Sequence, residues 1–228
     1  MSTLILDIET VGREFDSFDE QTQKDLTRWL EDDSELDELK DGLGLNPLTG
    51  EVVSIGVLDR DKMKGVVWYQ APGEKYEDYE EDGIKYIQKS EKEILKEFWR
   101  VANEYTEFVT FNGRQFDIPF LMIRSAIHGI RPSKDLMRGR YIYQSAPGAV
   151  HIDLFDLFSF YGSLRKKGSL HLYANAFGIE TSKGGEVEGK NLNSAFKNKM
   201  FKEIAYYNGK DLFVTKELYE YWNTYLRF

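Results

Sequence analysis

The sequence predicts an α/β protein with a single domain over residues 1–228, in which an antiparallel start is followed by alternating strands and helices. Two observations predict this class. Glu51–Leu58 and Gly65–Gln70 are strand-like runs with turn residues between them, which is the pattern of an antiparallel hairpin. Further along, stretches with apolar residues at helical spacing alternate with short β-branched and aromatic runs. The sequence contains no internal repeat, linker or low-complexity tract that would favour another architecture.

The individual elements follow from local residues. Thr3–Ile8 is a short, apolar, β-branched run and is predicted to be the first strand. Ser90 and Glu93 have the spacing of a capping box, which opens a helix that extends to about Glu104. The other predicted elements are a strand at Phe108–Phe111, a helix at Ile118–His128, a short strand at Val150–Ile152, helices at Leu154–Tyr161 and Ser169–Phe177, and two helices within Asn193–Tyr225.

The composition limits the classes of function. Charged residues make up 30% of the chain and hydrophobic residues 41%, which is typical of a folded protein rather than a disordered one. The absence of cysteine excludes disulfides, thiolate metal sites and cysteine nucleophiles. No apolar run approaches the roughly 20 residues of a membrane span, and MSTLILDIET lacks the features of a signal peptide. We therefore expect a cytoplasmic protein without a membrane partner.

The net charge of −9 at first speaks against a nucleic-acid partner, but the charge is unevenly distributed. Residues 13–41 carry a local net charge of −8 and residues 74–93 one of −4, whereas residues 94–228 carry +5. Both acidic segments are expected to be solvated surface elements. The net charge of the whole chain is therefore a poor guide to what the rest of the protein binds.

Residues 13–50 have the character of an acidic insertion between the first strand and the hairpin. Leu26, Trp29 and Leu30 fall at helical spacing, which predicts an amphipathic helix that docks on the main body. This segment is a candidate lid or partner surface.

Asp7 and Glu9 are the first candidate site residues. In a strand, residues i and i+2 point to one face, so the two carboxylates project together while Leu6 and Ile8 face the core. Crowded carboxylates repel each other unless a cation lies between them, and oxygen ligands suit Mg²⁺ or Mn²⁺. A solvated strand end is the alternative interpretation.

Asp117 is the second candidate, because a carboxylate between a strand and a helix is well placed to line a cleft at the edge of a sheet. Its alternative role is that of a helix N-cap, which is common for Asp. Tyr207 and Asp211 are the third candidates. They are i and i+4 on a predicted helix, so the phenol and the carboxylate can reach one volume, although an ordinary polar helix face is the alternative.

Four acids and a tyrosine at such positions are typical of a two-metal site. Two divalent cations, Mg²⁺ or Mn²⁺, about 3.5–4 Å apart can activate a water and stabilise a leaving oxygen in phosphodiester hydrolysis. Asp7, Glu9, Asp117 and Asp211 would be the metal ligands. Their four negative charges would balance the two cations, so the site could accept a phosphate.

Three motifs, in this order, resemble those of the DEDD (DnaQ-like) 3′–5′ exonuclease superfamily: Leu6–Thr10, Asn112–Asp117, and Tyr207-x-x-x-Asp211. The tyrosine four residues before the last aspartate is typical of the DEDDy branch. The similarity is strongest to stand-alone relatives of the proofreading domain of family B DNA polymerases. It extends from residue 3 to about residue 220 and includes flanking stretches at Val150–Leu154, Ser169–Leu172 and Gly184–Gly189.

The resemblance implies a ribonuclease H-like fold, with a mixed five-stranded sheet flanked by helices. It also implies roles for the five candidates. Asp7 would bridge both metal ions, Glu9 and Asp211 would bind the ion that holds the attacking water, and Asp117 would bind the second ion. Tyr207 would orient the water.

Four further residues are expected to bind substrate. Asn112 and Phe116 match motif positions that hold the 3′-terminal nucleotides, although Phe116 could instead be a core residue. Thr10 and Val11 follow the first motif and would lie beside the terminal sugar and base. Five basic residues also make a plausible set of phosphate contacts, with scattered solvated side chains as the alternative: Arg138, Arg140, Arg165, Lys166 and Lys167.

The expected function is a metal-dependent 3′–5′ exonuclease that releases nucleoside monophosphates from single-stranded ends, with DNA favoured over RNA. The alternatives are an exoribonuclease, a catalytically silent nucleic-acid-binding subunit and a structural protein with the same fold. One departure from the family pattern is Gly209, within the last motif, which weakens a helix by up to about 1 kcal/mol relative to alanine.

Overall fold

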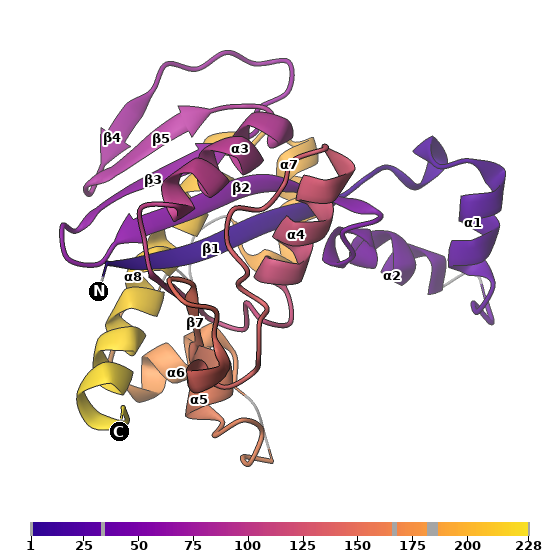
Figure 1. The fold of residues 1–228 in the computed structure, drawn as a ribbon. Helices are drawn as coiled ribbons and strands as arrows, with labels where there is room; N and C mark the ends of the chain where they lie inside the picture. The colour runs from indigo at the N-terminus through magenta and orange to yellow at the C-terminus, as the bar shows by residue number, and fades with distance from the viewer. Residues whose placement is uncertain (1, 33–34, 166–167, 182–186, 228) are drawn as a thin grey trace.

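The computed structural model describes residues 2–32, 35–165, 168–181 and 187–227, and in these residues a mixed sheet of seven strands carries helices on both faces (Figure 1). Lys166, Lys167 and residues 184–186 lie outside the described residues. The strands are β1 (Thr3–Gly12), β2 (Gly50–Asp59), β3 (Lys64–Tyr69), β4 (Tyr79–Glu81), β5 (Ile84–Gln88), β6 (Glu107–Thr110) and β7 (Val150–Asp153), in the spatial order β4-β5-β3-β2-β1-β6-β7.

The helices are α1 (Glu20–Thr27), α2 (Glu35–Gly42), α3 (Glu91–Ala102), α4 (Asp117–Ile127), α5 (Leu154–Phe158), α6 (Leu170–Ala176), α7 (Leu192–Lys197) and α8 (Phe201–Tyr225). Single 3₁₀ turns occur at Phe15–Ser17, Leu43–Leu45, Ile142–Gln144 and Gly189–Asn191. The capping box that opens α3 is present, because the Glu93 carboxylate accepts hydrogen bonds from the backbone N–H and the hydroxyl of Ser90. Within the described residues, no helix has both the length and the apolarity that crossing a membrane requires.

The α/β class and the mixed sheet are confirmed, but the sheet has seven strands rather than five. β1 pairs antiparallel with β2 and parallel with β6, which places the first strand in the middle of the sheet. The additional strands, β4 and β5, form a hairpin around Asp82 and Gly83, which have φ values of 51° and 79°. An Asp-Gly pair suits this turn, because both central residues need positive φ. Because acidic residues surround this turn, the segment was expected from the sequence to be a solvated surface element, and the hairpin was not predicted.

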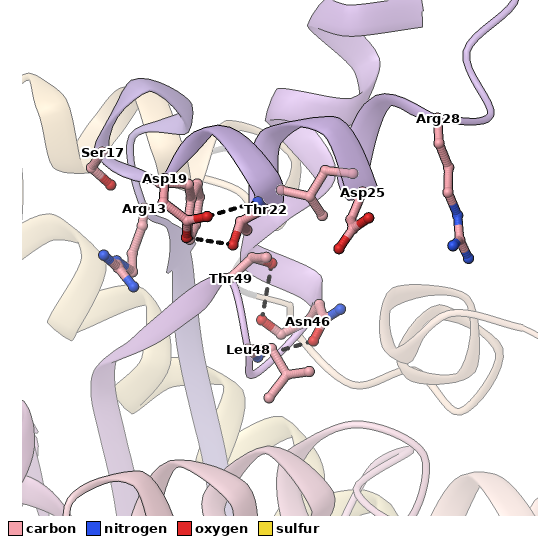
Figure 2. A pocket seen from close by; sticks show the side chains of 11 residues that line it. Arg13, Ser17, Asp19, Thr22, Asp25, Arg28, Asn46, Leu48 and Thr49 are labelled. Atoms are coloured by element: carbon pink, nitrogen blue, oxygen red, sulfur yellow. Dashed lines mark hydrogen bonds between the residues drawn. The ribbon is translucent and has the colours of Figure 1, made fainter.

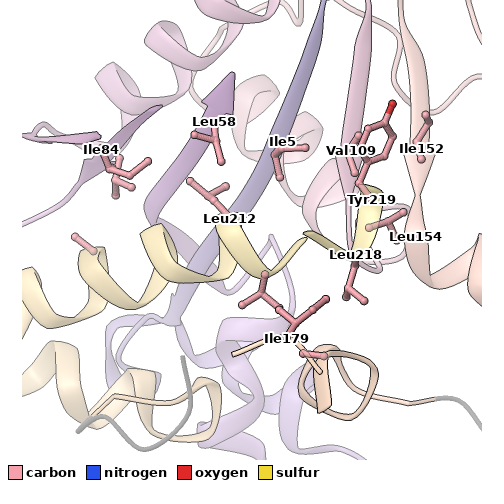
Figure 3. Close-up of a cluster of buried hydrophobic side chains, with 14 of the residues drawn as sticks. Ile5, Leu58, Ile84, Val109, Ile152, Leu154, Ile179, Leu212, Leu218 and Tyr219 are labelled. Atoms are coloured by element: carbon pink, nitrogen blue, oxygen red, sulfur yellow. The ribbon is translucent and has the colours of Figure 1, made fainter. Parts of the chain in front are cut away.

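Both faces of the sheet are covered, and the side chains of β1 alternate between them. Leu4, Leu6 and Ile8 pack in a cluster that includes residues of α3 and α4. Ile5 packs on the opposite face, in a cluster that includes Leu212 and Leu218 of α8 (Figure 3). Asp7 and Glu9 continue the series of Ile5, so the strand period directs them toward α8.

The segment expected to be an insertion contains two short helices that extend away from the sheet (Figure 1). Neither α1 nor α2 contains a buried residue, and 76% of Trp29 is exposed. The expected helix is thus present, but the expectation that it docks on the main body was wrong. α1 ends at Thr27, before Trp29 and Leu30, so these residues do not form one apolar face.

Candidate active site

Three carboxylates from two elements meet above the middle of the sheet. Ligand oxygens of Asp7 and Glu9 on β1 and of Asp211 on α8 all lie within 4.8 Å of one another. The β2 neighbours of the two β1 acids are small, since Asp7 lies opposite Gly56 and Glu9 opposite Ser54. A Cβ atom on Gly56 would lie only 2.7 Å from the Asn208 side chain, so glycine at this position allows α8 to approach the sheet.

Burial and repulsion from neighbouring acids disfavour the ionised forms of Asp7 and Glu9. Burial raises the pKa of Asp7 well above its usual value, and the charges of Asp117 and Asp211 raise it further. Burial also raises the pKa of Glu9, with contributions from Asp7, Asp211 and Asp117. A cation between the carboxylates would remove the repulsion and favour ionisation.

Asp117 is the first residue of α4 and is buried. Its Oδ1 accepts a hydrogen bond of 3.2 Å from the backbone N–H of Ile8, between the two β1 acids. Burial raises the pKa of Asp117 to about 7. The N-cap of α4 is Phe116, so the alternative that Asp117 serves as the N-cap was wrong. Asp117 acts electrostatically on Asp7 and Glu9 without belonging to the tight cluster of three.

The loop before α4 is held by a further buried acid. Asp153 accepts hydrogen bonds of 2.8 Å from the N–H of Asn112 and 2.9 Å from that of Arg114. Asn112 has a φ of 65°, a region that asparagine tolerates better than most residues. A Cβ atom on Gly113 would lie 2.4 Å from Thr110 Oγ1, so this position requires glycine. Oδ1 of Asn112 is buried and has no partner among the described residues.

Tyr207 lies one turn before Asp211 on α8, as the i, i+4 spacing predicts, and hydrogen-bonds to its carboxylate. Burial raises the pKa of the Tyr207 phenol, and the charges of Asp211, Glu9 and Asp7 add to this effect. The phenol therefore keeps its proton at neutral pH and remains a hydrogen-bond donor.

The sequence interpretation missed Asn208, which lies between Tyr207 and Asp211 and is completely buried. Its Nδ2 donates a hydrogen bond of 2.6 Å to Oδ2 of Asp7, and its Oδ1 accepts one of 2.8 Å from Ser54 Oγ. Asn208 thereby links α8 to both central strands. The signal for it was an amide side chain at helical spacing from the apolar residues Ile204, Ala205 and Leu212, which form the buried face of α8.

Two cavities border the cluster. A cavity of about 460 Å³ is lined by Glu9, Thr10, Asp41, Gly44, Leu45, Phe116, Gly189, Leu192 and Asn193. A smaller one of about 120 Å³ is lined by Ser169, Leu170, His171, Thr181, Tyr207, Asp211 and Val214.

The four expected substrate-binding residues are placed differently with respect to these cavities. Thr10 and Phe116 line the larger cavity, and Phe116 also packs on Phe120, with ring centroids 5.6 Å apart. Val11 is 3% exposed and packs in an apolar cluster with Val53 and Ile204 instead. Of the basic residues expected to contact phosphate, Arg140 is engaged with the buried Asp156 at 2.8 Å.

A separate cavity of about 620 Å³ lies between α1 and the turn before β2 (Figure 2). Asp19 accepts hydrogen bonds there from the N–H and the hydroxyl of Thr22, and Arg13, Arg28 and Leu48 also line it. This cavity contains none of the motif residues.

The donor set at the centre of the sheet suits hard divalent cations. Asp7, Glu9 and Asp211 offer carboxylate oxygens only, and these oxygens are close enough to share an ion. Such ions could polarise a phosphoryl group or lower the pKa of a water. The arrangement is therefore able to support metal-assisted hydrolysis of a phosphate ester.

Comparisons with known proteins find similarity to parts of DNA polymerases. The chain is 35% identical over 116 residues to a DNA polymerase of Methanocaldococcus jannaschii. The aligned residues make up 47% of this chain and 7% of the polymerase. It is 24% identical over 172 residues to DNA polymerase 1 of Sulfurisphaera ohwakuensis. This alignment covers 67% of this chain and 19% of that protein. The chain thus spans less than a fifth of the length of these two relatives.

The fold is shared with a solved polymerase. The structure of the family B DNA polymerase from Pyrobaculum calidifontis superimposes with a TM-score of 0.62 at 18% identity, covering 97% of this chain and 24% of the polymerase. This likeness supports the ribonuclease H-like class that the motifs implied. Residues 51–228, most of the chain, match a family of predicted 3′–5′ exonucleases related to the exonuclease domain of PolB, and the chain belongs to that family.

Proposed function

We propose that this protein is a metal-dependent 3′–5′ exonuclease that hydrolyses the terminal phosphodiester of single-stranded DNA and releases nucleoside monophosphates. The observation that carries the proposal is the approach of the Asp7, Glu9 and Asp211 oxygens to within 4.8 Å of one another. The family match begins at residue 51, so it does not include Asp7 and Glu9. The proximity of Asp7 and Glu9 to Asp211 is therefore an observation from the structure that is independent of the family match.

Two Mg²⁺ or Mn²⁺ ions would supply the Lewis acidity and the activated water for this reaction. Asp7 would contact both ions, Glu9 and Asp211 would hold one of them, and Asp117 would hold the other. Binding of the ions would favour the ionised forms of Asp7, Glu9 and Asp117 against burial, which raises the pKa of each of these carboxyls. In this assignment, the bound cations rather than basic side chains would attract the phosphate of the substrate.

The other residues of the site would position the reactants. The protonated Tyr207 phenol, beside Asp211, would hold the attacking water by a hydrogen bond. Thr10 and Phe116 line the cavity next to Glu9, where the terminal nucleoside would lie. Asn112 lines neither cavity, and its buried Oδ1 has no partner among the described residues, so its assignment to the 3′-terminal nucleotides rests on the motif.

A 5′-labelled single-stranded oligonucleotide tests the proposal. With Mg²⁺ or Mn²⁺ we expect progressive shortening from the 3′ end, lost in EDTA and in Asp7→Ala. Asp25→Asn, an exposed acid on α1, is the matched control and should retain full activity. An oligonucleotide that stays intact with either ion would refute the proposal. An RNA of the same sequence tests whether the enzyme prefers DNA or RNA, because only RNA offers a 2′-hydroxyl. Preferential cleavage of the RNA would favour the exoribonuclease alternative.

A further inference from the structure

The larger cavity beside Glu9 has one wall that comes from the acidic insertion. Gly44 and Leu45, in the 3₁₀ turn after α2, line it together with Thr10 and Phe116 of the motifs. Leu45 is 71% exposed, so the folded chain leaves most of this apolar side chain uncovered. The insertion therefore contributes an apolar surface directly beside the carboxylate cluster.

Close backbone packing fixes this wall to the strand that carries Asp7 and Glu9. A Cβ atom on Gly44 would lie 2.9 Å from the backbone nitrogen of Gly12, and one on Gly12 would lie 2.8 Å from Leu43 Cβ. A Cβ atom on Gly50 would lie 3.1 Å from Gly44 Cα. Glycine at these three positions lets the turn lie directly against the end of β1 and the start of β2.

Hydrogen bonds hold the same turn from several sides. The Thr10 hydroxyl donates to the Gly44 carbonyl at 2.7 Å, and the Thr49 hydroxyl donates to the Leu43 carbonyl at 2.7 Å. Asn193 of α7 accepts from the Gly12 N–H at 2.8 Å and donates to the Asp41 carbonyl at 3.0 Å. Leu45 thus projects from a fixed turn, in contrast to the outward helix α1.

The lining of this cavity selects the part of a nucleotide that fits it. Its charged members among the described side chains are the acids Glu9 and Asp41, so these side chains offer a phosphate no positive charge. Its apolar members, Leu45, Phe116 and Leu192, favour a flat, uncharged group. A nucleobase has this character, whereas the phosphate would be drawn to the cations at the neighbouring carboxylates.

We propose that Leu45 is a positioning residue for the substrate, which packs against the base of the 3′-terminal nucleotide in the cavity shared with Phe116. This inference rests on the proposed exonuclease function. It gives the 3₁₀ turn of the insertion, Leu43–Leu45, a part in substrate binding. Leu45 binds the base equally in the ground state and in the transition state, so its contact affects KM rather than kcat.

The test compares Leu45→Ala with Leu48→Ala on two oligonucleotides. Leu48 is a matched control, since it is 65% exposed in the same segment but lines the separate cavity near α1 (Figure 2). One oligonucleotide has an ordinary 3′ end, and the other lacks only the base of its last nucleotide. For Leu45→Ala we expect KM to rise about fivefold on the ordinary end, with kcat and the thermal unfolding temperature unchanged. On the end without a base, Leu45→Ala should match the wild type.

Two further measurements complete the design. Leu45→Met should restore KM because it replaces the lost apolar contact. Fluorescence anisotropy with Ca²⁺ in place of Mg²⁺ should give the same pattern for binding without depending on hydrolysis. An equal effect of Leu45→Ala on both oligonucleotides, or none on either, would overturn the assignment of Leu45. A wild-type protein that cleaves neither oligonucleotide would refute the proposed function, and anisotropy would still decide on Leu45.

Discussion

The side-chain amide of Asn208 connects Asp7 to the neighbouring strand. Its Nδ2 donates to Oδ2 of Asp7 at 2.6 Å, while its Oδ1 accepts from Ser54 Oγ at 2.8 Å. Because an ionised carboxylate only accepts hydrogen bonds, it requires the NH₂ end of the amide, and the Ser54 hydroxyl can donate to the remaining oxygen. The hydrogen bond lowers the pKa of Asp7 against the opposing effects of burial and of the neighbouring acids. Asn208 therefore orients the carboxylate and favours its ionised form.

Replacing Asn208 with alanine should weaken metal binding. A partner that orients a metal ligand typically contributes a factor of about 10–100 in affinity or activity. We expect the concentration of Mn²⁺ that gives half-maximal thermal stabilisation to rise by about this factor in Asn208→Ala. Ser54→Ala, which removes only the outer hydrogen bond, should show a smaller rise. Equal Mn²⁺ affinity in the wild type and Asn208→Ala would contradict this role.

The pH dependence of stability should reveal the buried Asp117 carboxyl. Its pKa is about 7 in the folded chain against an ordinary value of 3.8, so the folded chain binds this proton more tightly than the unfolded chain. The resulting stability is fully present below about pH 4 and is lost as the pH rises through 7. In EDTA, the free energy of unfolding of the wild type should thus fall relative to Asp117→Asn between about pH 5 and pH 8.

Urea unfolding at several pH values measures this difference, with the exposed Glu20→Gln as the control. Adding Mn²⁺ at about pH 8 should stabilise the wild type more than Asp117→Asn, because a cation removes the penalty of ionisation. A difference between wild type and Asp117→Asn that stays constant across this range would show that the carboxyl does not titrate there.

Gly209 should be required for packing, although alanine is the better helix former by about 1 kcal/mol. A Cβ atom at this position would lie 2.5 Å from the hydroxyl oxygen of Tyr86. Tyr86 is 2% exposed and stacks on Tyr79 at 4.6 Å, so its ring has little room to move. Since overpacking a core costs about 1–3 kcal/mol, Gly209→Ala should lower the thermal unfolding temperature. In a Tyr86→Phe background the loss should be smaller, and an equal loss in both backgrounds would exclude this contact as its cause.

Glu91 should be a main source of stability away from the site. Its carboxylate accepts two hydrogen bonds of 2.7 Å from Arg124 and one of 2.8 Å from the Val52 N–H, which joins α3, α4 and β2. Removing one partner of a buried ion pair typically costs about 3–5 kcal/mol, so Glu91→Ala should be strongly destabilised in urea unfolding. Glu97→Ala removes a surface pair with Arg100 and should cost about 1 kcal/mol or less. Similar losses in the two variants would contradict this account.

The sequence was sufficient to predict the elements that carry the site, because their signals are local. The alternation along β1 indicated that Asp7 and Glu9 share a face, and the i, i+4 spacing placed Tyr207 beside Asp211. The roles of these residues in catalysis remain predictions. The departure from the family pattern at Gly209 has a structural explanation, since the glycine allows α8 to pack against Tyr86.

What could not be predicted depends on contacts between distant segments. The bond between Asn208 and Asp7 joins residues 201 positions apart, and that between Thr10 and Gly44 spans 34 positions. Local periodicity carries no information about such pairs. The docking of the insertion was misjudged for the same reason. Trp29 is apolar but largely exposed, with the Arg28 guanidinium over its ring, whereas glycines where the insertion joins β1 and β2 make the close contacts.

The acidic hairpin at the end of the sheet also bears on how copies of this protein behave in a concentrated solution. β4 is the outermost strand on that side, is only three residues long, and exposes Glu80 and Glu81 (Figure 1). Behind it, β5 carries Ile84, Tyr86 and Ile87, a sequence that would readily pair with a strand of another molecule if it were uncovered. A short, negatively charged edge offers few backbone partners and repels its own copies. Some of the chain's negative charge thereby acts as a safeguard against aggregation.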